Sequence, residues 1–146
     1  MSMKSSNLYT GLAFAGATPF LACALLPLIG IESIAPIGRL ETVASSYGLA
    51  IICFLAGSHW ATYLLRRDDI RINLFVSSNV VFLFVWFAFV IAELAWVLGT
   101  QLIAFIVLLL IDHRLLQTDV ISADYFRVRS IATALAVISL SVILIS

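Results

Sequence analysis

Five long runs of apolar residues constrain this chain more than any other feature of its sequence. A transmembrane helix needs about 20 consecutive apolar residues to cross roughly 30 Å of hydrocarbon. Runs of this kind cover residues 8–30, 44–65, 72–92, 94–111 and 130–146. Soluble domains carry about 25% charged residues, whereas this chain is 11% charged and 63% hydrophobic. The sequence therefore predicts an all-α membrane protein, a compact bundle of five transmembrane helices that forms a single domain over residues 1–146.

The third and fourth runs are separated by little more than Glu93, so one long helix has to be considered. A single helix from Ile72 to Ile111 would be roughly 60 Å long, about twice the thickness of the bilayer core. We therefore expect a tight turn near Ala92 and Glu93.

Basic residues segregate to one side of the expected bundle. Five spans place the N-terminus and the second and fourth loops on the same side of the membrane. Seven of the eight basic residues fall on that side, namely Lys4, Arg66, Arg67, Arg71, Arg114, Arg127 and Arg129. Short cytoplasmic loops collect Lys and Arg, so we expect a cytoplasmic N-terminus and a C-terminus outside. The first seven residues lack the arginines of a mitochondrial transit peptide, which favours a multi-pass protein of the bacterial inner (cytoplasmic) membrane.

His59 is the ionisable side chain that falls inside hydrocarbon in this arrangement. It precedes Arg66 by seven residues, which places it about 10 Å below the helix end. Asn79 follows Arg71 by eight residues and falls at nearly the same depth. An unpaired polar group in hydrocarbon costs several kcal/mol, so we expect His59 to hydrogen-bond Asn79 or a serine of the third span. Such a bond can serve helix packing alone, or it can mark a functional site, as intramembrane ionisable residues often do.

The functional alternative for His59 is a ligand cavity near the cytoplasmic half of the bundle. The candidate lining residues are His59, Trp60, Asn79 and Gln101. No cofactor is expected, because His113, the second histidine, lies some 10 Å shallower than His59 and a shared haem is disfavoured. No metal site is expected either, since Cys23 and Cys53 are isolated and form no CxxC motif.

A face of small residues follows span two at spacings of three and four. It includes Ala50, Cys53, Gly57 and Ala61. Small residues at this spacing allow helix backbones to approach closely. We therefore expect this face to pack against another helix.

Charged residues at the cytoplasmic rim are candidates for contact with a partner protein or with anionic lipid. They are Asp112, Arg114, Arg127 and Arg129. Overall, eight Lys and Arg balance eight Asp and Glu, so no net charge points to nucleic acid.

Several segments resemble a small membrane family in their order and spacing. They are GLAFAGATPF (residues 11–20), YGLAIICFLAGSHWA (47–61), IDHRLL (111–116) and YFRVRSIATALAVISL (125–140). Together they are similar to the family catalogued as domain of unknown function 3429, which includes transmembrane protein 69 of mitochondria. The resemblance implies a compact five-helix protein of bacterial inner or mitochondrial membranes, and it implies no established reaction.

Two classes of function follow from these observations. The chain has no serine-histidine-acid set, no paired buried carboxylates and no glycine-rich phosphate loop, so catalysis is disfavoured. We expect an accessory or assembly subunit of a larger membrane complex. The alternative is binding or transport of a small hydrophobic molecule such as a quinone, lipid or tetrapyrrole.

Overall fold

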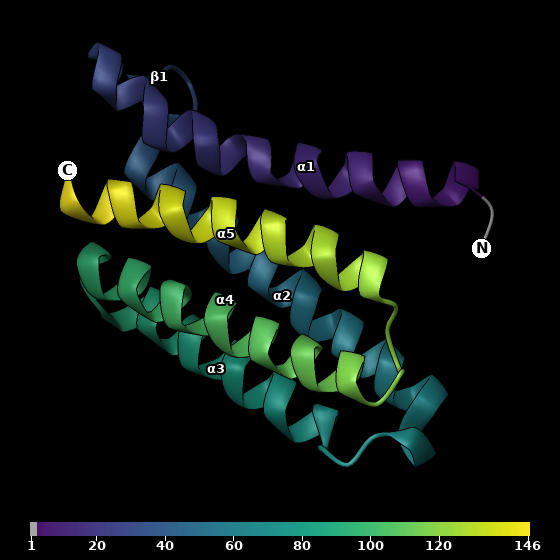
Figure 1. Cartoon of the computed structure of the whole chain (residues 1–146). Coiled ribbons are helices and arrows are strands. Elements are labelled where there is room, and N and C mark those ends of the chain that lie inside the picture. Colours follow the sequence, from purple (N-terminus) through teal and green to yellow (C-terminus); the bar gives the residue numbers. More distant parts are fainter. Residues whose placement is uncertain (1–2) are drawn as a thin grey trace.

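Five long helices make up most of the computed structural model, which describes the backbone of residues 3–146 and the side chains of residues 8–146 (Figure 1). The helices are α1 (Met3–Leu25), α2 (Leu40–Arg66), α3 (Leu74–Ile91), α4 (Leu94–Gln117) and α5 (Ala123–Ile145). Each of them contains a stretch that is long and apolar enough to cross a membrane. The prediction of an all-α, five-helix membrane protein is confirmed.

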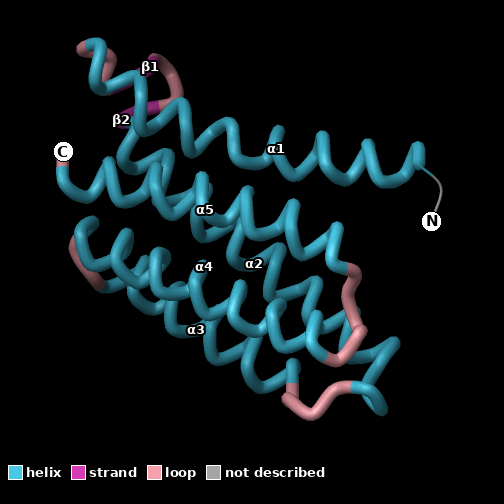
Figure 2. The backbone as a smooth tube through the Cα atoms, in the orientation of Figure 1, coloured by secondary structure: helices cyan, strands magenta, loops and turns pink. Residues whose placement is uncertain are grey.

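The connections between the helices are short and lie at the two ends of the bundle (Figure 2). They contain the single-turn helices η1 (Leu26–Ile29) and η2 (Arg67–Asp69) and a hairpin of strands β1 (Ser33–Ile34) and β2 (Gly38–Arg39). The expected break between the third and fourth spans is present, because α3 ends at Ile91 and α4 begins at Leu94.

Two helices extend further than their apolar runs. The fourth run ends at Ile111, but α4 continues to Gln117. The fifth run starts at residue 130, but α5 begins at Ala123, where the Ser122 side chain accepts a hydrogen bond from the Tyr125 backbone N–H at 3.2 Å. Charged residues end an apolar run without ending a helix, because the helix propensities of ordinary residues differ by no more than about 0.7 kcal/mol. Two of the four residues that the sequence places at the rim, Asp112 and Arg129, therefore lie inside the bundle.

The helices pack in an order that differs from their order along the chain. Helix α1 packs against α5 and α2, while α2 also packs against α3 and α4, and α4 packs against α5. In Figure 1, α5 lies between α1 and α4, and α1 diverges from α2 toward the N-terminus. This divergence opens the cavity described below.

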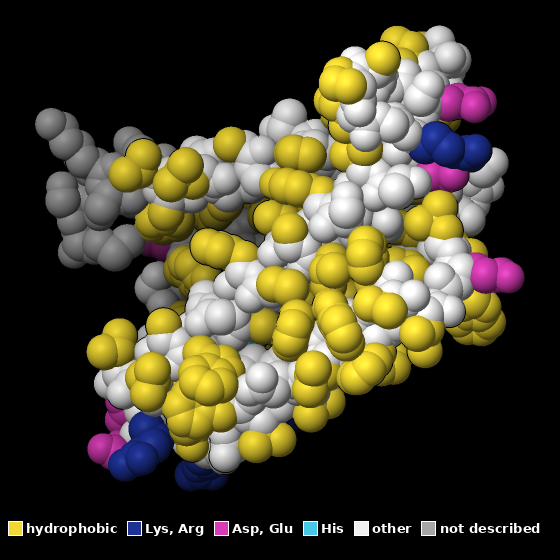
Figure 3. Space-filling model, turned by 180° about the vertical axis from the view of Figure 1, so that it is seen from behind, with side chains coloured by type: hydrophobic (Ala, Val, Ile, Leu, Met, Phe, Trp, Pro, Cys, Tyr) yellow, Lys and Arg dark blue, Asp and Glu magenta, His cyan; other side chains and the backbone are white. Residues whose placement is uncertain are grey.

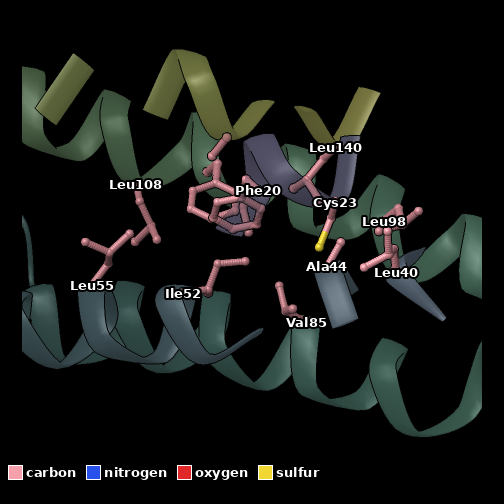
Figure 4. Packing of buried hydrophobic residues seen from close by; sticks show 13 residues of the cluster. Phe20, Cys23, Leu40, Ala44, Ile52, Leu55, Val85, Leu98, Leu108 and Leu140 are labelled. Atoms are coloured by element: carbon pink, nitrogen blue, oxygen red, sulfur yellow. The ribbon is translucent and has the colours of Figure 1, made fainter. Parts of the chain in front are cut away.

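The core between the helices is filled by interlocking side chains (Figure 4). Phe20, Ile52, Val85, Leu108 and Leu140 are each at most 1% exposed. Lipid tails are as apolar as these side chains, so close packing rather than transfer from water stabilises this core. Charged side chains lie at the two ends of the face seen in Figure 3, with hydrophobic side chains over the middle.

Helix α2 buries a different face from the one expected. Ala50, Gly57 and Ala61 are exposed and Cys53 is half-buried, and a Cβ added to Gly57 would meet no other helix within 4 Å. Within the chain, the prediction that this face packs against another helix is therefore wrong. The buried face includes His59 instead, because a polar side chain needs protein partners, whereas small apolar residues can face lipid.

Candidate functional site

Four buried polar side chains from three helices form one cluster, called here the Asp112 cluster. It comprises His59 on α2, Asp112 on α4, and Arg129 and Thr133 on α5. The carboxylate of Asp112 is at its centre: Oδ1 lies 2.8 Å from His59 Nε2 and Oδ2 accepts from Arg129 Nε at 2.9 Å. Arg129 Nη1 donates to Thr133 Oγ1 at 3.3 Å. The cluster therefore links α2, α4 and α5.

The lengths of the helices bring these residues to one depth. At 1.5 Å per residue, His59 lies roughly 10 Å before the end of α2 at Arg66, and Asp112 roughly 8 Å before the end of α4 at Gln117. Arg129 lies roughly 9 Å after the start of α5 at Ala123. The three helix ends lie at the same end of the bundle (Figure 1), so the side chains meet.

The charges of the cluster compensate one another out of contact with water. His59 and Asp112 are 3% exposed and Arg129 is 9% exposed. An arginine side chain is a cation in proteins, and a buried cation requires a partner, which Asp112 provides. Both carboxylate oxygens accept hydrogen bonds, so the facing His59 Nε2 carries a hydrogen and donates it.

Two nitrogens of the cluster remain without a hydrogen-bond partner. They are His59 Nδ1 and Arg129 Nη2, and both are buried. Most buried polar groups in proteins are hydrogen-bonded. The cluster therefore has hydrogen-bonding capacity that its own residues do not use.

An apolar cavity of about 400 Å³ lies beside the cluster, between α1, α2 and α5. Its lining includes small residues of α1 and α5 such as Gly16 and Ala132, the Phe20 and Phe105 rings, and Arg129 and Thr133 of the cluster. The cavity arises because α1 is held to α2 at one level, where the Tyr47 hydroxyl donates to the Gly16 carbonyl at 2.8 Å. Phe20 packs edge to face on Tyr47 and on Phe105 at the same level. From there α1 diverges toward its N-terminus.

The arrangement resembles a ligand site in its composition. Sites for small molecules are mostly apolar, have volumes of about 300–1,000 Å³ and contain a few polar groups that fix orientation. Here the apolar wall is combined with an arginine whose guanidinium is held by Asp112. The cavity thus combines an apolar wall with one cationic side chain, Arg129.

The four predicted ligand residues do not converge. His59 does not pair with Asn79, and that expectation is wrong: His59 binds Asp112, while Asn79 Nδ2 donates to the Phe75 carbonyl of its own helix at 2.7 Å. Trp60 is 43% exposed and lies on Phe75, with ring centroids 4.5 Å apart. The cavity is not lined by any of these residues.

Gln101 is fully buried elsewhere in the bundle. Its Nε2 donates to the Ser45 carbonyl on α2 at 2.7 Å. Its side chain occupies the space beside Gly48, where an added Cβ would lie 2.9 Å from Gln101 Cδ and would overlap Oε1. Gln101 therefore joins α4 to α2 at a point where a residue larger than glycine would force the Gln101 side chain to move.

The rim candidates separate into two pairs. Arg114 and Arg127 are exposed at the end of the bundle, where contact with lipid or a partner stays a prediction. Asp112 and Arg129 are buried and bind each other, so their prediction as surface contacts is wrong. The reason is the extended length of α4 and α5, which places both side chains inside the bundle. A signal for Arg129 was present in its spacing from Thr133, because residues four apart share one helix face.

Comparison with known proteins places the chain in a family. The family model described as "Protein of unknown function (DUF3429)" matches residues 5–145. The chain belongs to the DUF3429 family. No curated protein and no solved structure matches it. The resemblance drawn from the sequence is thus confirmed over nearly the whole chain.

Proposed function

We propose that this protein binds an amphipathic molecule of the membrane in the cavity between α1, α2 and α5. The observation that carries the proposal is the position of Arg129, which lines an apolar cavity and has a buried Nη2 without a hydrogen-bond acceptor. Intramembrane ionisable residues mark functional sites by default. Ligand binding is the alternative function that was expected from the sequence, but the proposed site is formed by different residues.

The position of the cavity indicates where its ligand comes from. Its walls belong to helices that are long and apolar enough to span a membrane. The lining is mostly apolar, and it includes the Tyr9 and Tyr125 rings near the ends of their helices. A molecule that dissolves in the bilayer could enter between α1 and α2, where the two helices diverge (Figure 1).

In this proposal the Asp112 cluster holds the arginine in place. Asp112 fixes Arg129 Nε, and Thr133 accepts from Nη1. The guanidinium then has little freedom to lose when a ligand binds, and preorganisation of this kind raises affinity. His59 supports the carboxylate and does not touch the ligand.

The test introduces a large side chain on the face of α5 that lines the cavity. The control introduces the same side chain on a face of α5 outside the cavity. Ala132 lines the cavity, whereas Ala134 on the same helix is exposed away from it. The protein would be extracted from its membrane in mild detergent and weighed by native mass spectrometry. Wild type and Ala134→Trp should carry the same small-molecule mass, and Ala132→Trp should lose it. Wild type without a bound mass, or Ala132→Trp that retains it, would overturn the proposal.

A second candidate is the accessory or assembly subunit. It is favoured by the exposed small-residue face of α2, since Ala50, Gly57 and Ala61 contact no other helix of the chain closely enough to be buried. The same native mass spectra address it: a stoichiometric protein partner that is lost in Gly57→Leu would support this role. Detection of the chain without a protein partner in both wild type and Gly57→Leu would exclude this role.

We also propose that the protein lies in the bacterial inner membrane with its N-terminus in the cytoplasm. Arg66, Arg67, Arg71, Arg114 and Arg127 support this orientation, because they are exposed and belong to one end of the bundle. At the other end, Arg39 is paired with Glu41 at 2.7 Å.

A further inference from the structure

We infer that the ligand is a lipid-like molecule with an acidic head group, a carboxylate or a phosphate, that binds at Arg129 with its hydrocarbon chain in the cavity. The inference rests on the proposed function and specifies the chemical class of the ligand. It follows from the donor and acceptor character of the lining, from the unused hydrogen-bonding capacity of the buried guanidinium and from the depth of the polar side chains that line the cavity.

Most of the polar side chains that line the cavity can donate hydrogen bonds to a ligand. The polar lining residues are Tyr9, Ser58, Tyr125, Arg129 and Thr133. Arginine can only donate and hydroxyl groups can rotate to donate, but the Ser58 hydroxyl already donates to the Leu55 carbonyl at 2.7 Å. No carboxylate is among the described lining residues, and Asp112 has both oxygens engaged by His59 and Arg129. Hydroxyl groups can also accept, but Arg129 can only donate, so a head group rich in acceptors suits this lining better than one made of donors.

The guanidinium of Arg129 is suited to an anionic oxygen head. Its Nε and Nη1 are occupied by Asp112 and Thr133, while Nη2 has no acceptor. Hydrogen bonds from arginine to carboxylate or phosphate are about twice as strong as neutral ones. Because Nη2 is buried, an acceptor there would act in a medium of low dielectric, where the interaction is strengthened further.

The polar residues of the cavity lie at a depth that suits a lipid bound within one leaflet of the membrane. Tyr125 and Arg129 lie roughly 3 Å and 9 Å past the start of α5 at Ala123. The apolar lining continues from there along Ala132 and Ala136 and reaches Phe20. The head would lie at the depth of the Asp112 cluster while the chain extends toward the centre of the bundle. A volume of about 400 Å³ is at the lower end of the range for ligand sites and suits one hydrocarbon chain.

The experiment compares probes that share one chain and differ in the head group. Oleate, oleoyl lysophosphatidate and neutral monoolein would be titrated into the full chain in maltoside micelles, with binding read by native mass spectrometry and by the shift in melting temperature. Wild type should bind at least one acid about tenfold more tightly than monoolein. Binding of oleate alone identifies a carboxylate site, and binding of lysophosphatidate alone identifies a phosphate site.

Two variants and a control locate the effect at Arg129. Arg129→Lys keeps a cation beside Asp112 but loses the fork, so the preference for the acid should fall to within about threefold of monoolein. Arg127→Gln removes an exposed arginine two positions away and should leave the preference unchanged. Tyr125→Phe removes one hydroxyl from the lining and takes away none of the hydrogen bonds within the Asp112 cluster, so it should weaken binding of the acid while binding of monoolein stays the same.

The outcomes separate this inference from the proposed function. Equal binding of monoolein and the acids would overturn the acidic head group and leave the cavity as a binding site. A preference for the acid that persists in Arg129→Lys, or in Ala132→Trp, would place the binding elsewhere and overturn the inference. A wild-type chain that carries no small-molecule mass and binds none of the probes would overturn both.

Discussion

Replacement of Asp112 by alanine should destabilise the bundle more than any change at an exposed charge. In the folded state the carboxylate accepts from His59 at 2.8 Å and from Arg129 at 2.9 Å, and it is 3% exposed. The Asp112→Ala variant retains the Arg129 cation in the same buried place without a counter-ion. Removing one partner of a buried pair costs about 3–5 kcal/mol, and we expect a loss of unfolding free energy in this range.

The chain contains a matched control for this variant. Arg66 Nε donates to Asp69 Oδ2 at 2.8 Å, and the two side chains are 48% and 52% exposed. Exposed pairs contribute about 0–1 kcal/mol because water and salt screen them. Asp69→Ala should therefore reduce the unfolding free energy by about 1 kcal/mol at most.

Both variants would be unfolded reversibly by dodecyl sulfate in mixed micelles, with helicity followed by circular dichroism. A third variant, Asp112→Leu combined with Arg129→Met, removes both charges and should recover much of the loss, because apolar residues of similar size often replace a buried ion pair without penalty. If Asp112→Ala were no more destabilising than Asp69→Ala, the reasoning about a buried, mutually compensating cluster would be refuted.

Two further predictions concern packing and orientation. Gly48→Ala should lower the unfolding free energy by about 1–3 kcal/mol, because its Cβ would overlap the Gln101 side chain. Gly57→Ala should change the unfolding free energy by less than about 0.5 kcal/mol. Equal effects of the two substitutions would contradict the packing described for α2. Orientation would be tested with single cysteines in a Cys23→Ala, Cys53→Ala background. An impermeant maleimide would be added to bacterial spheroplasts, whose inner membrane is intact. The exposed position in Asp68→Cys should be protected, and the one in Glu32→Cys should be labelled. Labelling at residue 68 alone would reverse the proposed orientation.

The number of helices could be predicted because the bilayer fixes the length of an apolar run. The break at Ala92 and Glu93 also follows from length, since a helix of both runs would be about twice as long as the bilayer is thick. The ends of α4 and α5 could not be found in this way. Hydropathy reports which residues prefer lipid, and it does not report where backbone hydrogen bonding stops, so Asp112 and Arg129 were placed at the rim.

The depth of His59 could be predicted, but its partner could not. Rise per residue gives depth along a helix, and that estimate placed His59 and Asn79 at nearly equal levels. The direction in which each side chain points around the helix axis depends on tertiary packing. Asn79 bonds its own backbone at the Phe75 carbonyl, while the face of α2 that carries His59 is directed toward α4. The cavity depends on the angle between α1 and α2, which no local pattern encodes.

The pairing of Asp112 with Arg129 has a consequence for the way the protein enters its membrane. The two residues are 17 positions apart on consecutive helices joined by a short connection. Inserted alone, α4 would carry an acid into hydrocarbon and α5 would carry a base, and each charge at depth is expensive. Inserted together as a hairpin, the two helices bring a neutral pair. Helices α4 and α5 should therefore insert into the membrane as one unit. They should then pack against α2, which is already inserted, through the contact between Asp112 and His59.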